Sequence, residues 1–578
     1  MMHQVTTLPS LRRRVRSLLL AAVFLSPLLF FALFYFYPLA AILRLGLWLE
    51  GRLDTVALGE LFRSAYFLRV LWFTVWQAVV STLLTLALAL PGAYVLARYR
   101  FRGQTLIRAV ATLPFVLPTV VVAAAFVALV GPAGVLNVWL MRLLALDAPP
   151  IRLSQTVWII LLAHVFYNYS VALRLLSAYW QNLPPSLSQA AQMLGASPAR
   201  AFLTVTLPLL RPALLAAAAL VFTFTFTSFG VIVVLGGPRF ATLEVEIYRQ
   251  AVNLFNLPVA AALSLWQILF TFILMAGYTR TQLQVTRALR LGARRSIEQP
   301  VRTPRQRLLV IGNAAAILVL IGAPLLALVS RSLRGAAGPT LAYYRALFTN
   351  RDDSLFFVPP VVAIRNSIAV ALVATLLAVA LGLITAQLLT RWERGPGRGN
   401  GGRVALARLL DPLLMLPLAT SAVTLGLGYL IALGRPPLNL RGSILILPIA
   451  HAVVAAPFVL RSVLPGFRSI LPSLREAAAV MGADGWRVWR EVDWPLIRRP
   501  LLVGALFAFT ISMGEFGATI FLVRPETPTL PIAIYRFLGQ PGALNYGQAL
   551  AMSVLLLLVC AVAFVAIEHF RVGGEGGF

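Results

Sequence analysis

The chain contains no lysine, and the 49 residues counted as lysine or arginine are all arginines. A phosphate-binding loop of the GxxxxGK[ST] type needs its lysine to contact the β- and γ-phosphates of a nucleotide. The sequence therefore excludes a nucleotide-hydrolysing loop of that type. Any ATP that this protein uses must be hydrolysed by another subunit.

Cysteine and charged residues are also scarce. Cys560 is the single cysteine, which excludes an internal disulfide and a cysteine-ligated metal cluster. Only 12% of the 578 residues are charged and 60% are hydrophobic, which excludes a soluble globular protein. A helix of about 20 apolar residues spans a bilayer, and about twelve stretches are long enough. We expect an all-α integral membrane protein.

The net charge of +30 would suggest nucleic acid as a partner of a soluble protein. Here the arginines gather in alternate loops between apolar runs, which is the positive-inside pattern of membrane proteins. We therefore expect no nucleic acid partner and cytoplasmic N- and C-termini. The run Leu18–Leu43 is too long for a signal peptide and predicts an uncleaved first span.

The predicted spans form two groups of six around an arginine-rich cytoplasmic linker, residues 282–307. The first half covers residues 18–281 and the second covers 308–572. Residues 1–17 form a cytoplasmic N-terminal segment and 573–578 a C-terminal tail. The expected spans are Leu18–Leu43, Leu68–Ala97, Ile107–Val130, Ser154–Ala178, Pro208–Leu235, Leu257–Tyr278, Leu308–Val329, Asn366–Leu389, Leu409–Leu433, Ser443–Leu464, Pro495–Leu522 and Tyr546–Phe570.

The two halves are an internal duplication. A spacing of 287 residues relates Gly195 to Gly482 and His164 to His451. Six spans separate the two glycines, and an even number returns the chain to the same side of the membrane. The halves are therefore predicted to be parallel repeats with both glycine loops in the cytoplasm.

The glycine loops cover residues 184–208 and 471–495, and each reads as a short helix, a glycine turn and a second short helix. Small alanines would let another protein approach the backbone closely, although an amphipathic helix lying in the lipid headgroups is the alternative. The candidate coupling residues are Gln189, Ala190, Ala191, Gly195 and Pro208 in the first copy and Glu476, Ala477, Ala478, Gly482 and Pro495 in the second.

The order E-A-A, three residues, G and a later hydrophobic-x-L-P resembles the cytoplasmic loop of ABC-importer permeases, in which this coupling helix docks on an ATPase subunit. Gln189 replaces the glutamate in the first copy, and Trp494 replaces the usual leucine in the second. Gln189 keeps the hydrogen-bonding groups of the glutamate but has no charge, so it cannot form a salt bridge.

Two permease units in one chain are similar to the fused ferric-iron and thiamine permeases. The stretches Leu235–Pro238 and Thr242–Tyr248 resemble the thiamine group more closely. The resemblance implies the type I importer permease fold in a bacterial-type plasma (inner) membrane and a translocation path for thiamine or ferric iron. It further implies two ATPase copies, an extracytoplasmic solute-binding protein and surrounding membrane lipid. It also implies that the chain itself is not an enzyme, has no catalytic residues and binds no cofactor, with ATP and magnesium on the partner.

Glu515 is the one acidic residue well inside a predicted span, where a carboxylate faces a cavity or a partner. It either lines the path of a cationic or metal-bound solute, or holds the end of its helix by hydrogen bonds. His164, His451 and Ser228 are further path candidates. No carboxylate or cysteine accompanies the histidines at ligand spacing, so we expect packing histidines and no metal site.

Two other classes compete with an importer permease. An ion-gradient-driven secondary transporter also has twelve spans in two parallel halves, but is expected to carry several intramembrane ionisable residues or interrupted helices. A membrane-embedded enzyme needs a cluster of catalytic carboxylates or histidines, and the sequence contains no such cluster. The importer permease is therefore the preferred prediction.

Overall fold

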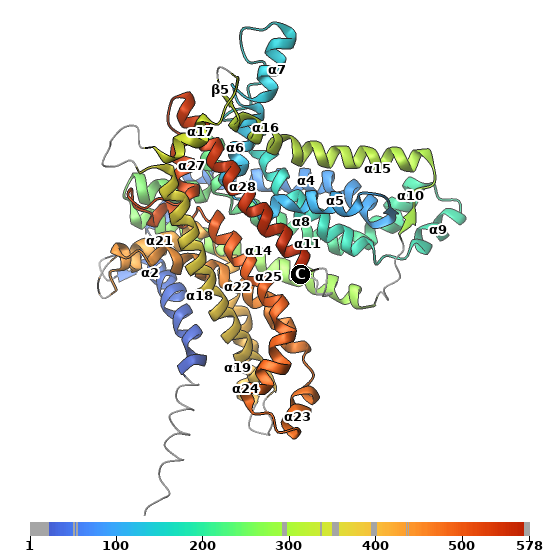
Figure 1. Ribbon diagram of the computed structural model, residues 1–578, viewed down its shortest axis with the longest axis vertical. Helices are drawn as coiled ribbons and strands as arrows, with labels where there is room; N and C mark the ends of the chain where they lie inside the picture. The colour runs from blue at the N-terminus through green and yellow to red at the C-terminus, as the bar shows by residue number, and fades with distance from the viewer. Residues whose placement is uncertain are drawn as a thin grey trace, which may run out of the picture. The chain divides into compact units, whose positions relative to one another are not determined.

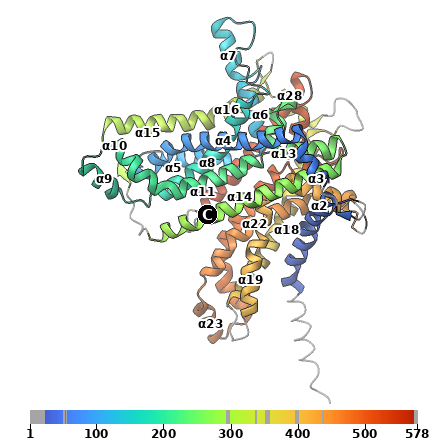
Figure 2. The same cartoon turned by 180° about the vertical axis from the view of Figure 1, so that it is seen from behind.

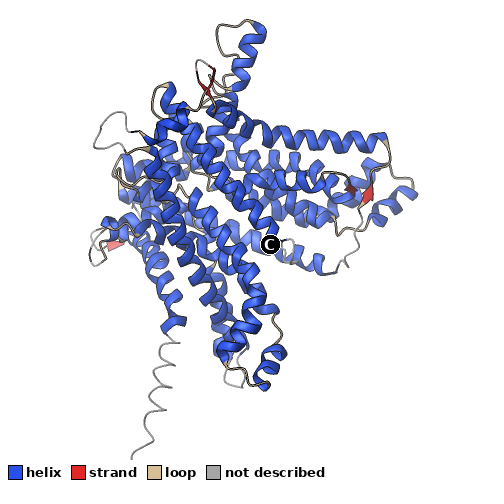
Figure 3. Cartoon of the chain, viewed as in Figure 1, coloured by secondary structure: helices blue, strands red, loops and turns tan. Residues whose placement is uncertain are grey.

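A computed structural model describes residues 22–49, 52–53, 56–291, 298–335, 338–349, 358–394, 401–434, 436 and 438–571. The predicted N-terminal segment (1–17), the C-terminal tail (573–578) and part of the linker (292–297) lie outside the described residues. Helices dominate the part of the chain that is described (Figure 3). The strands there form three two-residue pairs: β1 (Trp48–Leu49) with β2 (Arg52–Leu53), β3 (Tyr99–Arg100) with β4 (Gln299–Pro300), and β5 (Arg334–Gly335) with β6 (Gly338–Pro339).

Eleven described helices are long and apolar enough to cross a membrane, or up to twelve if one bent pair counts as a single span. The expectation of an all-α membrane protein with about twelve spans is confirmed. The first span is Ala22–Leu47, which contains η1 (Ala32–Phe36) and α2 (Tyr37–Leu47). The bent pair joins Gly402–Ala419 to Ala422–Ala432 at an angle of 97°.

One compact unit consists of Leu45–Val361 and Leu530–Ala561. Its centre is formed by helices that lie side by side (Figures 1 and 2): α4 (Ala65–Arg98), α8 (Val157–Trp180), α11 (Leu207–Phe226) and α14 (Leu257–Leu291). Two helices from the start of the second sequence half also pack here, α15 (Pro304–Ile317) on α4 and α16 (Ala323–Ser332) on α6 (Thr119–Val130).

The other compact unit consists of Met1–Arg44, Val362–Thr529 and Val562–Phe578. Helices α22 (Ile446–Ser469) and α25 (Trp494–Gly514) pack along each other, and α18 (Pro360–Arg394) approaches α22 so closely that a Cβ on Gly382 would lie 2.7 Å from Val459. The first span packs in this unit as well. Its Pro38 lies 3.0 Å from the position of a Cβ on Gly428 in α21 (Ala422–Ala432).

The compact units therefore do not coincide with the two sequence halves. Each half contributes its first span to the unit built mainly from the other half. Close packing explains the exchange, because Gly428 leaves room for the first span and Tyr35 of that span hydrogen-bonds Thr420. The last helix, α28 (Ala543–Arg571), is divided between the units after Ala561.

The 287-residue repeat extends to individual elements. Three consecutive elements of the first loop, α9 (Pro185–Met193), α10 (Pro198–Ala201) and the π-helix η3 (Phe202–Thr206), recur as α23 (Pro472–Val480), α24 (Gly485–Val488) and the π-helix η9 (Trp489–Asp493). A proline follows each π-helix, Pro208 and Pro495. Proline has no amide hydrogen to continue the normal i→i−4 ladder, so the helix register changes at the same place in both copies.

Four predicted spans are interrupted. Prolines indicate a kink near two of these breaks, Pro118 in one span and Pro417 in the other, and no proline lies at the other two. Ile107–Val130 breaks at Leu117 and Leu409–Leu433 at Thr420. Pro208–Leu235 is divided into α11 and α12 (Gly230–Leu235), and Pro495–Leu522 into α25 and α26 (Thr519–Leu522). The expectation that interrupted helices would distinguish a secondary transporter was therefore wrong, since they occur here too.

The remaining described elements connect these helices. They are α3 (Val56–Arg63), α5 (Gln104–Thr112), η2 (Leu113–Val116), α7 (Val135–Leu144), η4 (Gly237–Arg239), α13 (Leu243–Tyr248), η5 (Arg249–Asn253), η6 (Leu318–Gly322), α17 (Ala342–Arg345), η7 (Ala346–Phe348), α19 (Gly401–Leu414), α20 (Leu416–Ala419), η8 (Leu440–Gly442) and α27 (Leu530–Leu538).

Candidate functional site: two loops and two polar helix breaks

The first glycine loop folds as the sequence predicts. Helix α9 ends where the amide of Ala196 donates to the carbonyl of Ala191 at 3.0 Å. Gly195 has φ +89°, a left-handed conformation that side chains other than glycine adopt at a cost. Ser197 then caps α10 by accepting a hydrogen bond from the amide of Arg200 at 3.3 Å. Gln189, Ala190 and Pro208 are exposed and Ala191 is half-buried.

The second loop repeats this geometry. Gly482 has φ +80°, and the amide of Ala483 donates to the carbonyl of Ala478 at 3.0 Å. Asp484 replaces Ser197 as the cap and accepts from the amide of Arg487 at 2.8 Å. Glu476, Ala477 and Pro495 are exposed, whereas Ala478 is buried.

Each loop presents two large apolar side chains to its surroundings immediately before the glycine. Met193 and Leu194 are 88% and 90% exposed, and the equivalent Val480 and Met481 are 89% and 80% exposed. A scattered exposed apolar residue is ordinary, but the same pair at the same turn of both copies is a repeated feature. The sequence pattern of small residues did not single out these four side chains.

The second copy also contains a salt bridge behind its loop. The Nε atom of Arg475 in α23 lies 2.7 Å from the Oδ1 atom of Asp493 in η9. Arg391, at the end of α18, interacts electrostatically with both residues. The 287-residue spacing places Ser188 and Thr206 at the corresponding positions of the first copy, where no such pair can form.

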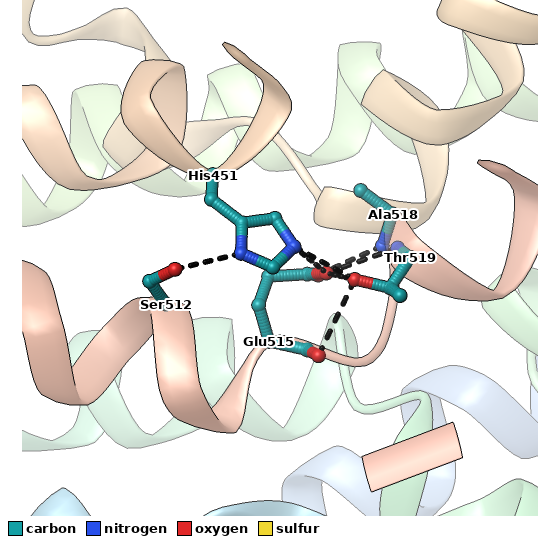
Figure 4. A network of polar contacts seen from close by, with 5 residues as sticks. All are labelled: His451, Ser512, Glu515, Ala518 and Thr519. Atoms are coloured by element: carbon teal, nitrogen blue, oxygen red, sulfur yellow. Dashed lines mark hydrogen bonds and ion pairs between the residues drawn. The ribbon is translucent and has the colours of Figure 1, made fainter. Parts of the chain in front are cut away.

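A buried polar network lies at the break between α25 and α26 (Figure 4). The carboxylate of Glu515 accepts hydrogen bonds from the amides of Ala518 at 2.8 Å and Thr519 at 2.9 Å, and from the Thr519 hydroxyl. His451 lies between Ser512, 2.7 Å from Nδ1, and Thr519, 2.8 Å from Nε2. Glu515 therefore closes the end of one helix and supplies acceptors to the first turn of the next.

The first copy has a simpler network at the equivalent break between α11 and α12. His164 Nδ1 lies 3.2 Å from Ser81 Oγ, and Nε2 lies 2.8 Å from Ser228 Oγ. The 287-residue spacing relates Ser228 to Glu515, so the two path candidates occupy one repeat position. The structure thus brings His164 to Ser228 and His451 to Glu515, and it connects each break to its loop through α11 or α25.

Two further acidic residues are buried, and the sequence analysis did not identify them as buried. Glu244 and Glu246 of α13 lie between the predicted spans Pro208–Leu235 and Leu257–Tyr278, and both are 0% exposed. Glu246 accepts hydrogen bonds from Tyr66 at 2.7 Å and from Gln250 at 2.7 Å, and Arg249 lies 3.7 Å away. Helix α13 packs on α4 and α14, at the end of these helices away from α9 (Figure 2). The short spacing of the two acids in an apolar stretch was the available signal.

The described residues contain no group of three or more histidine, cysteine or acidic side chains that could hold a metal ion. His164 and His451 have hydroxyl and carboxylate neighbours instead. Their contacts are those of side chains that join helices.

Comparison with known proteins gives a family match in both halves. The family of the binding-protein-dependent transport system inner membrane component matches residues 89–286 and 378–572. The chain is similar to the thiamine transport system permease protein ThiP of Escherichia coli (strain K12), with 29% identity over 92% of this chain and 93% of that protein. ThiP of Brucella abortus (strain 2308) is 29% identical over 86% of this chain and 88% of its own. A probable ABC transporter permease protein, y4fN, of Sinorhizobium fredii is 27% identical over 92% and 93%.

Proposed function

Because this chain belongs to the family of binding-protein-dependent transport system inner membrane components, we propose that it forms the path by which thiamine enters the cell. The permease itself is not an enzyme, and ATP is hydrolysed on separate subunits. We assign thiamine rather than ferric iron because the relatives from Escherichia and Brucella carry the name of thiamine permeases. An extracytoplasmic solute-binding protein would deliver the solute, and ATP with magnesium would be bound by the partner ATPase.

The duplicated exposed apolar pair carries the proposal that two ATPase copies dock on this chain. Met193 and Leu194 lie at the end of α9, and Val480 and Met481 at the end of α23. Apolar side chains that project from a tight turn lose unfavourable contact with water when a partner covers them. A Cβ added at Gly195 or Gly482 would meet nothing within 4 Å, so the turn leaves open space for that partner.

One continuous helix joins each docking loop to a polar break. Helix α11 runs from Leu207 to Phe226, two residues before Ser228, and α25 runs from Trp494 to Gly514, directly before Glu515. A helix of 20 residues is about 30 Å long, which is the thickness of the hydrocarbon core. Movement of a loop would therefore be transmitted along a single rigid element to the break inside the membrane.

We propose that each break borders the translocation path within its own unit, with Glu515 and His451 as the polar residues of one break and Ser228 and His164 as those of the other. The Glu515 carboxylate is already engaged by two amides and a hydroxyl. We therefore assign it to holding the break in one conformation rather than to binding the solute continuously. ATP binding can drive transport only if docking favours one conformation of this break over another.

The proposed orientation follows from the docking sites. Both loops face the cytoplasm, where ATPase subunits and ATP are present, and the N- and C-termini lie on that same side because of their parity with the loops. The Glu246 network, at the opposite end of α4 from α9, then lies toward the binding protein.

Transport in reconstituted vesicles tests the function. The chain, its ATPase and its binding protein are placed in vesicles, and uptake of radiolabelled thiamine and of ferric iron is compared with and without ATP. Accumulation of thiamine that requires both ATP and the ATPase is expected. Uptake that continues without the ATPase and collapses with a proton uncoupler would instead identify an ion-gradient-driven transporter.

A further inference from the structure

A cavity of about 900 Å³ lies behind the first docking loop. Its walls come from the last turns of α4, from one face of α9, from α10 and η3, and from α15. Pro185, Ser188, Gln189 and Gln192 line it at the spacing of one helix face, while Met193 and Leu194 do not take part. Cavities of about 300–1,000 Å³ are the usual size of small-molecule sites.

Arg98 is the one charged side chain among the residues that line this cavity. It is half-buried and makes no hydrogen bond or ion pair with any residue that the structure describes. Glu298, which precedes the cavity-lining Gln299, is paired with Arg108 at 3.1 Å. An arginine placed in a partly desolvated space without an anion lacks the partner that normally compensates its burial.

The second copy shows what fills the equivalent space. There Arg475 and Asp493 form their 2.7 Å salt bridge, and Asp493 also attracts Arg391 from the end of α18. The first copy has Ser188 and Thr206 at these two positions, and both line the cavity. The first copy therefore keeps an arginine at the end of the corresponding long helix but lacks the carboxylate that neutralises it.

The remaining walls favour a flat organic body beside the anionic group. Tyr94 packs against Trp180 with ring centroids 5.4 Å apart, and Trp180 stacks on Phe202 at 6.1 Å. All three rings line the cavity. Neutral donors surround them, with amides from Gln189, Gln192 and Asn313 and hydroxyls from Ser188 and Thr206.

We propose that this cavity binds an organic phosphate whose anionic group pairs with Arg98, at the position that Asp493 occupies in the second copy. Arginine matches phosphate oxygens in a bidentate geometry, and the nearby hydroxyls and amides supply donors for the third oxygen. The ligand is either a soluble phosphate ester or the headgroup of an anionic phospholipid. Since the ligand lies between α9 and α4, it holds the first docking loop against the membrane helices.

Binding to the full-length chain tests the proposal and does not depend on transport or on docking. The purified protein in phosphatidylcholine nanodiscs is titrated with phenyl phosphate and, for comparison, with benzoate and inorganic phosphate. Phenyl phosphate is expected to bind at one site per chain and more tightly than either comparison ligand. Arg98→Gln should weaken it by at least about tenfold, since a charge-assisted pair is lost. The control Arg391→Gln should leave binding unchanged.

A second variant fills the cavity with the salt bridge that the second copy contains. Ser188→Arg combined with Thr206→Asp installs the salt bridge of the second copy in the first and should abolish phenyl phosphate binding. The thermal unfolding temperature of this variant reports whether it folds. Replacing phosphatidylcholine by phosphatidylglycerol distinguishes the two sources, because a headgroup ligand competes with phenyl phosphate and a soluble ligand does not. Undiminished binding to Arg98→Gln, or to the folded double variant, would overturn the proposal.

Discussion

The Nε2 atom of His451 lies 3.4 Å from the Oε2 atom of Glu515, and both side chains are buried where α25 is interrupted. In the first copy His164 meets the hydroxyl of Ser228 at the same repeat position. The duplication has thus kept the histidine in both halves and changed its partner. One break carries a carboxylate and the other a neutral hydroxyl, so the two breaks differ in how firmly they are held.

Glu515→Gln should weaken the break between α25 and α26. Glutamine has one acceptor oxygen where glutamate has two, so one of the amides of Ala518 and Thr519 loses its partner. A buried donor without a partner costs about 1–3 kcal/mol. We expect a lower unfolding temperature in detergent and slower thiamine uptake. Ser228→Ala is the matched control and should have the smaller effect on both. Normal expression with unchanged uptake would remove Glu515 from the path.

Leu194→Glu together with Met481→Glu should release the ATPase. Each change places a carboxylate at the centre of a proposed apolar contact, where it would be desolvated without a partner. Retention of the ATPase during affinity purification is the measurement. Ser186→Glu with Ser473→Glu places the same charges at the exposed first turns of α9 and α23 and should retain it. Equal retention by both double variants would contradict docking through the apolar pairs.

Gly195→Ala and Gly426→Ala should differ because their costs have different origins. At Gly195 an alanine meets no atom within 4 Å but must adopt φ +89°, which costs about 1 kcal/mol. At Gly426 the new Cβ would lie 2.9 Å from the Cα of Ala518, so the backbone of the Glu515 break must move. Gly195→Ala should therefore fold normally with modestly weaker docking, and Gly426→Ala should lower the unfolding temperature. Equal unfolding temperatures for the two variants would contradict the close packing of α21 on the break.

Asp493→Asn should disturb the second loop more than Thr206→Ser disturbs the first. Removing the carboxylate leaves Arg475 and Arg391 facing each other with no acid between them. Asparagine can still accept from Arg475 but carries no negative charge, so a bond of the charge-assisted kind, which contributes about 1.5–3 kcal/mol, becomes weaker and the two arginines repel each other. Proteolysis at the exposed loop arginines, followed by mass spectrometry, should show faster cleavage near Arg475. Raising the salt concentration should reduce the difference, and no difference at low salt would argue against the ion pair.

The sequence predicted the loops well because their determinants are local. A helix-ending glycine, small residues and a 287-residue repeat are all visible in the chain, and Gly195 and Gly482 adopt the expected left-handed geometry. The four helix breaks were not visible in the same way. Apolar residues lie on both sides of each break, so an average over a span-length window contains no interruption at Thr227 or Gly514.

Contacts between distant segments explain the other omissions. Glu246 is buried because Tyr66, 180 residues earlier, turns toward it, and no local pattern contains that contact. Arg98 lacks a carboxylate partner because the first copy has Thr206 where the second copy has Asp493, and only the folded second copy shows the salt bridge that Asp493 forms. The exchange of the first spans also depends on tertiary packing. Hydropathy located the span containing Tyr35 but could not indicate its contact with Thr420.

The exchange of first spans determines when, during synthesis, the first span can pack against the other half. Ile42 packs against Gly428, so this part of the first span reaches its final neighbours only after nearly four hundred further residues have been made. At about 5–20 residues per second, this delay is about 20–80 s. During that interval Tyr35 lacks its hydrogen bond to Thr420 and Ile42 lacks its contact with Gly428. Because the two permease units form one chain, the first span remains covalently linked to the segment that later packs against it.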